Sequence, residues 1–142
     1  MYKPIMMVSA IFLLLCGCGS SPKPIILQCS LSKSEFNSRA QDSLQTYKFH
    51  ILEADSVKIQ TIRKIEDGLS NRTVYLTLTN DSTTNEWSMI VRTIVTYHGE
   101  SNEYYMDEKP RFSNDFRRDF RPVLTAIRSM CAPPPKKKKK KL

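Results

Sequence analysis

The feature that most limits the fold of this chain is a strict alternation of apolar and polar residues near its middle. Between Thr73 and Thr79 (TVYLTLT), Val74, Leu76 and Leu78 alternate with threonines and a tyrosine. β-Branched and aromatic residues fit the pleated surface of a strand, and successive side chains of a strand point to opposite faces. The segment is therefore predicted to be a strand with one buried face.

Similar patterns on both sides extend this strand into a sheet. Trp87–Tyr97 (WSMIVRTIVTY) predicts a long partner strand, which the polar loop Asn80–Asn85 joins to the first as a hairpin. Ile62 shifts the alternation by one residue, which is typical of a bulge. His98–Asn102 is a predicted turn. Three shorter stretches alternate in the same way and are also predicted strands: Tyr47–Ile51, Val57–Thr61 and Glu103–Met106.

Helical spacing marks the two ends of this region. Ser32 and Glu35 have the spacing of a capping box and precede apolar residues four apart: Phe36, Ala40 and Leu44. A second amphipathic stripe recurs every three or four residues: Phe112, Phe116, Phe120, Leu124, Ile127 and Cys131. Pro122 lies inside this stripe and is expected to kink the helix or split it in two.

Together these segments predict a small α+β domain: an antiparallel sheet of four to five strands, with N- and C-terminal helices packed on one face. The domain is expected to span residues 25–131 and, at this size, to bury a single core. Residues 18–24 are expected to be a flexible tether, and residues 132–142 a disordered Pro/Lys tail.

The start of the chain is predicted to be a targeting segment. Lys3 is followed by an uncharged apolar run, Ile5–Leu15. Eleven helical residues reach only about half of a ~30 Å hydrocarbon core, so a permanent transmembrane helix is not expected. A charged start, a short apolar region and a small residue before a cleavage point are typical of a secretory signal peptide.

The residues after this run, Leu15-Cys16-Gly17-Cys18, resemble the lipobox of bacterial lipoproteins. The resemblance implies that residues 1–17 are a cleaved signal peptide and that Cys18 carries diacylglycerol and, usually, an acyl chain on the new amino terminus. Gly19, in place of the Asp that retains many such proteins in the inner membrane, implies a lipid-anchored protein of the outer membrane. Its periplasmic or surface orientation stays open. The alternative is an ordinary signal peptide and a soluble secreted protein with a free Cys18.

Processing of this kind leaves two cysteines, Cys29 and Cys131, at the two ends of the predicted domain. An extracytoplasmic compartment permits disulfides, and we expect these two residues to form one. The alternative is a pair of buried free thiols. A zinc site is not expected, because His50 and His98 are far apart in sequence and no paired ligand spacing is present.

The net charge of +8 comes mainly from outside the predicted domain. The tail supplies six of the 22 basic residues, and Lys3 and Lys23 supply two more, so residues 24–135 contain 14 basic and 14 acidic residues. A neutral domain lacks the basic surface of a nucleic-acid-binding protein, and no specific nucleic acid is expected as a partner. A local run of arginines is interpreted as the solvated face of the last helix: Arg111, Arg117, Arg118, Arg121 and Arg128.

No catalytic motif is found in the sequence. Gly-x-Ser-x-Gly, a phosphate-binding glycine loop and histidines at helical spacing are all missing. Four acidic residues have no calcium-loop spacing and are interpreted as a solvated edge: Glu100, Glu103, Asp107 and Glu108. Tyr104–Met106 beside them is either a contact patch or a strand with alternating burial. We therefore expect no enzyme activity, no metal and no cofactor.

The tail contains three prolines and six consecutive lysines. Prolines favour an extended conformation, and each lysine near an anionic surface contributes about 1 kcal/mol of attraction. The lysines are candidate contacts for anionic lipids, lipopolysaccharide or peptidoglycan: Lys136, Lys137, Lys138, Lys139, Lys140 and Lys141. The alternative is a dispensable solubilising tail.

These observations leave two hypotheses for function. The first is a non-enzymatic outer-membrane lipoprotein that acts as a binding or assembly module in the envelope, with peptidoglycan, lipopolysaccharide or an envelope protein as partner. The second is an inhibitor, immunity or exclusion lipoprotein that uses its sheet or loops to bind another protein.

Overall fold

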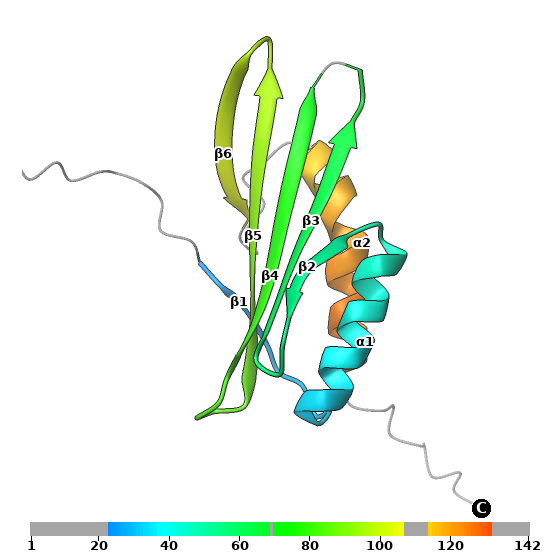
Figure 1. Ribbon diagram of the computed structural model, residues 1–142, viewed down its shortest axis with the longest axis vertical. Coiled ribbons are helices and arrows are strands. Elements are labelled where there is room, and N and C mark those ends of the chain that lie inside the picture. Colours follow the sequence, from blue (N-terminus) through cyan, green and yellow to red (C-terminus); the bar gives the residue numbers. More distant parts are fainter. Residues whose placement is uncertain (1–22, 69, 107–113, 132–142) are drawn as a thin grey trace, which may run out of the picture.

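A computed structural model describes residues 23–68, 70–106 and 114–131 of the chain. They form an α+β fold in which one sheet is accompanied by two helices (Figure 1). The elements, in chain order, are β1 (Ile25–Leu27), α1 (Lys33–Thr46), β2 (His50–Ala54), β3 (Lys58–Glu66), β4 (Asn71–Asp81), β5 (Glu86–Tyr97), β6 (Glu100–Met106) and α2 (Asn114–Cys131).

The sheet has six strands, and every pair in it is antiparallel. Its order is β1-β5-β4-β3-β2, and β6 also pairs with β5. β6 and β1 follow one another along the same edge of β5, because Met106 pairs with Val91 and Ile25 pairs with Met89. The long strand β5 therefore has partners on both sides over most of its length.

A single core cluster joins the helices to the sheet. Buried and less buried residues alternate along β4 and β5, as expected for strands with one covered face. Phe36 of α1 lies against Trp87 of β5, with 4.5 Å between ring centroids. Among the side chains that the structure describes, the helices contribute seven buried ones to this cluster: Phe36, Ala40 and Leu44 from α1, and Phe120, Val123, Ile127 and Cys131 from α2.

The predicted capping residue begins α1. The Ser32 hydroxyl accepts a hydrogen bond from the Glu35 amide at 3.3 Å. The helix ends in a Schellman motif: the amide of Phe49 donates to the Leu44 carbonyl, and that of Lys48 donates to the Gln45 carbonyl. Lys48 has a φ of 65°, in the left-handed region. The chain turns there and enters β2.

The strands differ from the sequence predictions in number and in detail. Four to five strands were predicted and six are present, because the three residues of β1 are too few to show a period of two. The predicted strand 47–51 was wrong at its start, since Tyr47 caps α1 and β2 begins at His50. The predicted bulge at Ile62 was also wrong: β3 pairs with β4 without interruption, and the register shift lies in β2 instead.

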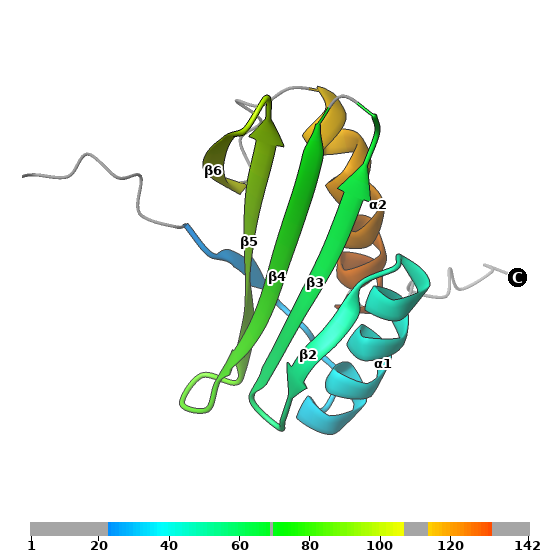
Figure 2. The same cartoon turned by 45° about the horizontal axis from the view of Figure 1, so that its top comes forward.

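The helices also differ from expectation. α1 is not the first element of the fold, because β1 precedes it. α2 is one continuous helix in which Pro122 is an interior residue, so it is not split in two. Val123 is fully buried and Leu124 only partly, which moves the apolar stripe by one residue. Figure 2 shows α2 behind the long strands and α1 beside β2.

Candidate functional site

The most distinctive surface is the face of the sheet whose side chains alternate with those of the core; we call it the open face. Five strands each place one side chain in a row across it, because cross-strand partners point to the same face. The row follows the register from β2 to β6: His50, Ile62, Tyr75, Arg92 and Tyr105. Residues far apart in sequence thus form one continuous stripe.

Arg92 is the charged centre of this row. Its guanidinium carbon lies 4.5 Å from the centroid of the Tyr75 ring, a cation–π distance. Its Nη1 lies 3.6 Å from Oε1 of Glu103, and both side chains are more than a third exposed. The tyrosine ring therefore supports the guanidinium from one side, while solvent reaches it from the other.

Glu103 also acts on Tyr105, the last member of the row. A hydrogen bond to the Glu103 carboxylate raises the pKa of the Tyr105 phenol above 10.0, and loss of hydration and the carboxylate charge act in the same direction. The charge of Arg92 opposes this effect. Arg92, Glu103 and Tyr105 are thus electrostatically coupled on an exposed surface.

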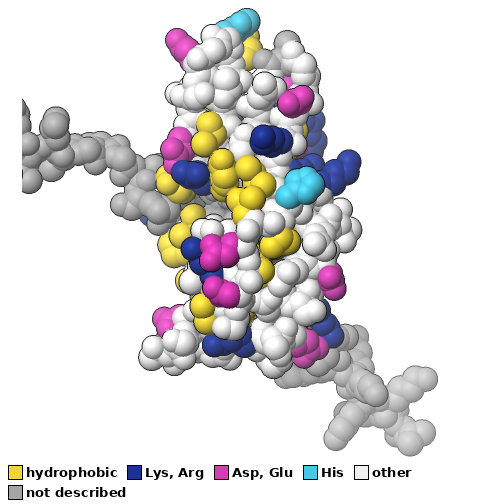
Figure 3. Space-filling view, in the orientation of Figure 1, with side chains coloured by type: hydrophobic (Ala, Val, Ile, Leu, Met, Phe, Trp, Pro, Cys, Tyr) yellow, Lys and Arg dark blue, Asp and Glu magenta, His cyan; other side chains and the backbone are white. Residues whose placement is uncertain are grey.

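A shallow hollow of about 470 Å³ lies over this part of the sheet, and we call it the open-face hollow. Seven outward side chains line it: Leu52, Gln60, Tyr75, Thr77, Ile90, Arg92 and Tyr105. Thr61 also lines the hollow, although this residue is buried and its hydroxyl donates to the Leu76 carbonyl. Arg92 is the one charged residue among the described residues of this lining. Figure 3 shows apolar side chains gathered in the middle of the face turned to the viewer.

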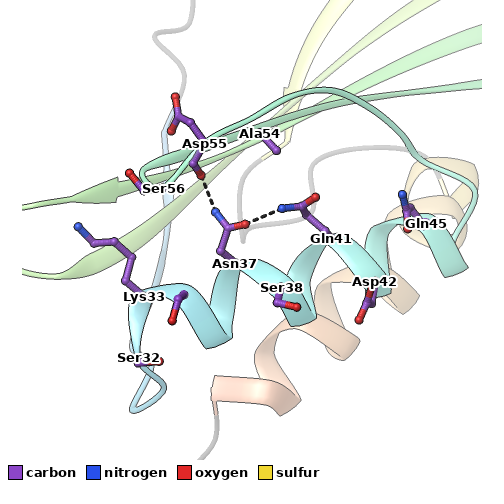
Figure 4. Close-up of a pocket in the computed structure, with 11 residues that line it drawn as sticks. Ser32, Lys33, Asn37, Ser38, Gln41, Asp42, Gln45, Ala54, Asp55 and Ser56 are labelled. Carbon is purple, nitrogen blue, oxygen red and sulfur yellow. Dashed lines mark hydrogen bonds between the residues drawn. The ribbon is translucent and has the colours of Figure 1, made fainter.

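A second concave surface lies between α1 and the β2–β3 turn, and it is larger and more polar (Figure 4). This groove has a volume of about 650 Å³, and its described lining residues carry hydroxyl, amide and charged side chains, together with Ala54. The Asn37 amide donates to the Asp55 carbonyl at 2.6 Å, and Gln41 donates to Asn37 Oδ1 at 2.6 Å. Ala54 is the one apolar side chain among the described residues of this lining, whereas the open-face hollow combines aliphatic and aromatic side chains with a guanidinium, so the open face is the better candidate.

The structure places the candidate residues from the sequence in separate regions. Cys29 and Cys131 form a disulfide that joins the segment after β1 to the end of α2. His50 belongs to the row, whereas His98 lies in the β5–β6 turn with a φ of 49°. Glu100 and Glu103 are exposed on β6. Other candidate residues lie outside the described residues: Cys18, Asp107, Glu108, Lys136, Lys137, Lys138, Lys139, Lys140 and Lys141.

Within the described ranges, no three His, Cys, Asp or Glu side chains are close enough to hold a metal ion. The same ranges contain no helix that is long and apolar enough to cross a membrane. Arg118, Arg121 and Arg128 of the predicted arginine face are exposed on α2. Arg111 lies outside the described residues, and the side chain of Arg117 is not described.

Two residues of the row were considered in the sequence, Tyr105 as part of the possible contact patch Tyr104–Met106 and His50 as a possible metal ligand. Tyr75 and Arg92 were not singled out and lie within two of the predicted strands. The signal that identifies them is register: once Thr77 is opposite Ile90, Tyr75 must be opposite Arg92. Comparison of the chain with protein-family models, with curated proteins and with solved structures found no match.

Proposed function

We propose that this chain is a non-enzymatic outer-membrane lipoprotein whose domain acts as a binding module in the cell envelope. The observation that carries the proposal is the open face, where a guanidinium, two phenols and aliphatic side chains surround a concave surface. Such a mixture of apolar, aromatic and few polar groups is typical of a binding site. The membrane anchor would be Cys18, as the lipobox resemblance implies.

The proposal takes α1 and α2 to pack on the same face of the sheet, which leaves the opposite face available to a partner. Two observations support this arrangement. The buried side chains of both helices belong to one core cluster with the inward residues of the strands. The outward residues of β4 between Thr73 and Thr79 are only partly buried or exposed.

The lysine tail is proposed to contact the anionic surface to which the anchor attaches. Cys131, from which the tail continues, is bonded to Cys29, and Cys29 is four residues beyond Ile25, the first residue after the tether. Four extended residues span at most about 14 Å. The tail and the tether therefore start from neighbouring points of the domain, and attraction of the lysines to anionic groups would decrease with added salt.

The test of the anchor is the intact mass of the protein extracted from membranes. An N-terminus at Cys18 that carries acyl mass is the expected result, and an unmodified Cys18 would contradict the proposal. The binding role is tested with a variant that lacks residues 136–141 and carries Cys18→Ala, so that neither the basic tail nor a lipid anchor can cause retention. We expect this protein to co-sediment with isolated envelope material, and failure to do so would count against a binding module.

The second candidate function is an inhibitor, immunity or exclusion factor that binds another protein. Tyr75, Arg92 and Tyr105 on the open face favour it, because tyrosine and arginine are enriched among the residues that dominate protein interfaces. This function predicts a stoichiometric protein complex that survives loss of the lysine tail. Size-exclusion chromatography of the tail-deleted protein extracted from its native membrane would detect such a complex.

A further inference from the structure

We infer that the open-face hollow binds a carboxylated saccharide unit, with the carboxylate on Arg92 and an apolar face of the sugar ring against tyrosine. The inference rests on the proposed function, because a position in the envelope would bring acidic sugars to this site. It goes further by assigning a chemical class of ligand to named side chains.

The size and lining of the hollow favour a small ligand. Its volume of about 470 Å³ lies within the range of small-molecule sites, which are concave and mostly apolar with a few oriented polar groups. A protein partner would need a patch of about 800 Å² on this chain, wider and flatter than the hollow. The observations therefore favour a ligand that enters the concavity.

The charge of the lining indicates an anion. Arg92 is the one charged side chain among the described residues that line the hollow, and Glu103, its ion-pair partner, lies outside this lining. The Glu103 carboxylate lies 3.6 Å from Arg92, beyond the usual length of a charge-assisted hydrogen bond. A ligand carboxylate can therefore approach the guanidinium, whose planar fork binds such groups in a bidentate manner.

Arg92 is also held in place before a ligand arrives. It lies on β5, which has a partner strand on each side at this position, and its guanidinium lies over the Tyr75 ring. A preorganised side chain loses little conformational freedom on binding. The geometry thus presents a fixed cation rather than a mobile surface charge.

The remaining side chains match a sugar better than a simple carboxylic acid. Tyr75 and Tyr105 offer ring surface on either side of Arg92 in the row, and Ile90 and Leu52 extend the apolar lining. Thr77 adds a hydroxyl group. The Gln60 amide lies 3.0 Å from both the Glu53 carboxylate and the Lys58 ammonium, which orients it at the edge of the hollow. A sugar combines apolar ring faces with hydroxyl groups, and an acidic sugar adds the anion.

The experiment is a chemical-shift titration of the isotope-labelled full chain, in detergent micelles, with N-acetylmuramic acid and with N-acetylglucosamine. The two sugars differ only by the 3-O-lactyl group of N-acetylmuramic acid, which carries the carboxylate. We expect N-acetylmuramic acid to shift amide signals of β4 and β5 around Tyr75 and Arg92, and to bind at least tenfold more tightly than N-acetylglucosamine. Equal binding of both sugars, or no shift from either, would overturn the inference.

Two variants and one further probe sharpen the test. Arg92→Gln should weaken N-acetylmuramic acid at least tenfold, whereas Lys64→Gln, which removes an exposed cation from the same face, should leave its affinity unchanged. N-Acetyl-aspartate amide supplies a carboxylate without a sugar ring, and binding as tight as that of N-acetylmuramic acid would overturn the saccharide assignment.

The outcome is separable from that of the proposed function. If Cys18 carries lipid and the sugar does not bind, the proposal of an envelope lipoprotein is retained and the assignment of this sugar site is wrong. If the sugar binds but Cys18 is unmodified, the site stands and the anchored location fails.

Discussion

Arg72 reaches from β4 to two carboxylates from other parts of the chain. Its Nη1 lies 2.7 Å from Oδ2 of Asp67, in the β3–β4 turn, and its Nη2 lies 2.8 Å from Oδ2 of Asp119 on α2. The arginine side chain is 5% exposed and that of Asp119 is 15% exposed. A buried charge of this kind is tolerated only while its partners are present. The ion pair between Arg72 and Asp119 therefore connects α2 to the sheet.

Replacement of Arg72 by alanine is expected to be strongly destabilising. Breaking a buried ion pair by removal of one partner typically costs about 3 to 5 kcal/mol, because the remaining charge loses its compensation. The matched control is Arg39→Ala, which removes an exposed ion pair with Glu35 inside α1 and should cost at most about 0.5 kcal/mol. Urea denaturation measures both, and similar losses for the two variants would contradict the role given to Arg72.

Glu103 and Tyr105 give a prediction about pH. Because the Glu103 carboxylate favours the protonated phenol, Glu103→Gln should lower the pKa of Tyr105 toward its ordinary value of 10.0. The raised pKa means that the folded state holds the proton more tightly than the unfolded state. The stabilisation is therefore complete below pH 10.0 and is lost as the pH rises through the folded-state pKa.

An NMR titration of the Tyr105 ring measures this pKa directly. Glu100→Gln is the matched control, since Glu100 lies on the same strand but pairs with Tyr97. It should leave the pKa of Tyr105 where it is. A pKa that does not move in Glu103→Gln would show that the hydrogen bond is not its main cause.

At the scale of elements, the junction between α1 and β2 depends on a residue in a costly conformation. Lys48 is the left-handed residue of the Schellman motif, a position that glycine usually fills. The left-handed backbone conformation costs a residue with a Cβ roughly 1 to 2 kcal/mol, whereas glycine adopts it without this cost. Replacing Lys48 by glycine would remove this cost, but part of the gain in stability would be offset by the greater conformational freedom of glycine in the unfolded chain.

Lys48→Gly is therefore expected to stabilise the protein, by up to about 1 kcal/mol. The contrasting variant is Ser38→Gly in the middle of α1, where the backbone is already in the favourable helical conformation. Glycine there should destabilise the protein by about 0.5 to 1 kcal/mol. Thermal unfolding of the two variants should thus show shifts of opposite sign. Destabilisation by both would mean that Lys48 is not strained in solution.

The same junction shows how far the sequence could predict the elements. Long periodic segments such as β4 and the capped start of α1 were predictable, because alternation and capping are local signals. The end of α1 was not, since Lys48 has none of the sequence character of a helix-ending glycine. The bulge in β2 arises from its pairing with β3, because Ile51 and Glu53 pair with the consecutive residues Thr61 and Gln60. The sequence of one strand alone does not determine such pairing.

The candidate site was less predictable than the fold for the same reason. Tyr75, Arg92 and Tyr105 come from three strands and become neighbours only through the register of the whole sheet. Arg72 was missed because it precedes the predicted strand 73–79 and because arginine is rarely a buried residue. Its burial depends on Asp119, which is 47 residues further along the chain.

At the scale of the whole molecule, the disulfide closes nearly the entire fold into one loop. Cys29 and Cys131 are 102 residues apart in sequence and connect the segment after β1 to the end of α2. In the chain-entropy view, a crosslink across about 100 residues stabilises the fold by roughly 4 to 5 kcal/mol, because it restricts the unfolded chain. The bond also joins the first strand, which has only three residues, to the last helix.

We expect the paired substitution Cys29→Ala and Cys131→Ala to lower the free energy of unfolding by about 4 to 5 kcal/mol, as measured by urea denaturation. Reduction of the wild-type protein should lower it by a similar amount, since both treatments release the same loop. Reduction should not affect the double variant further, which controls for other effects of the reductant. If instead both thiols of the wild type react with a labelling reagent before reduction, the residues are free thiols, and the core alone must hold β1 and α2 in place.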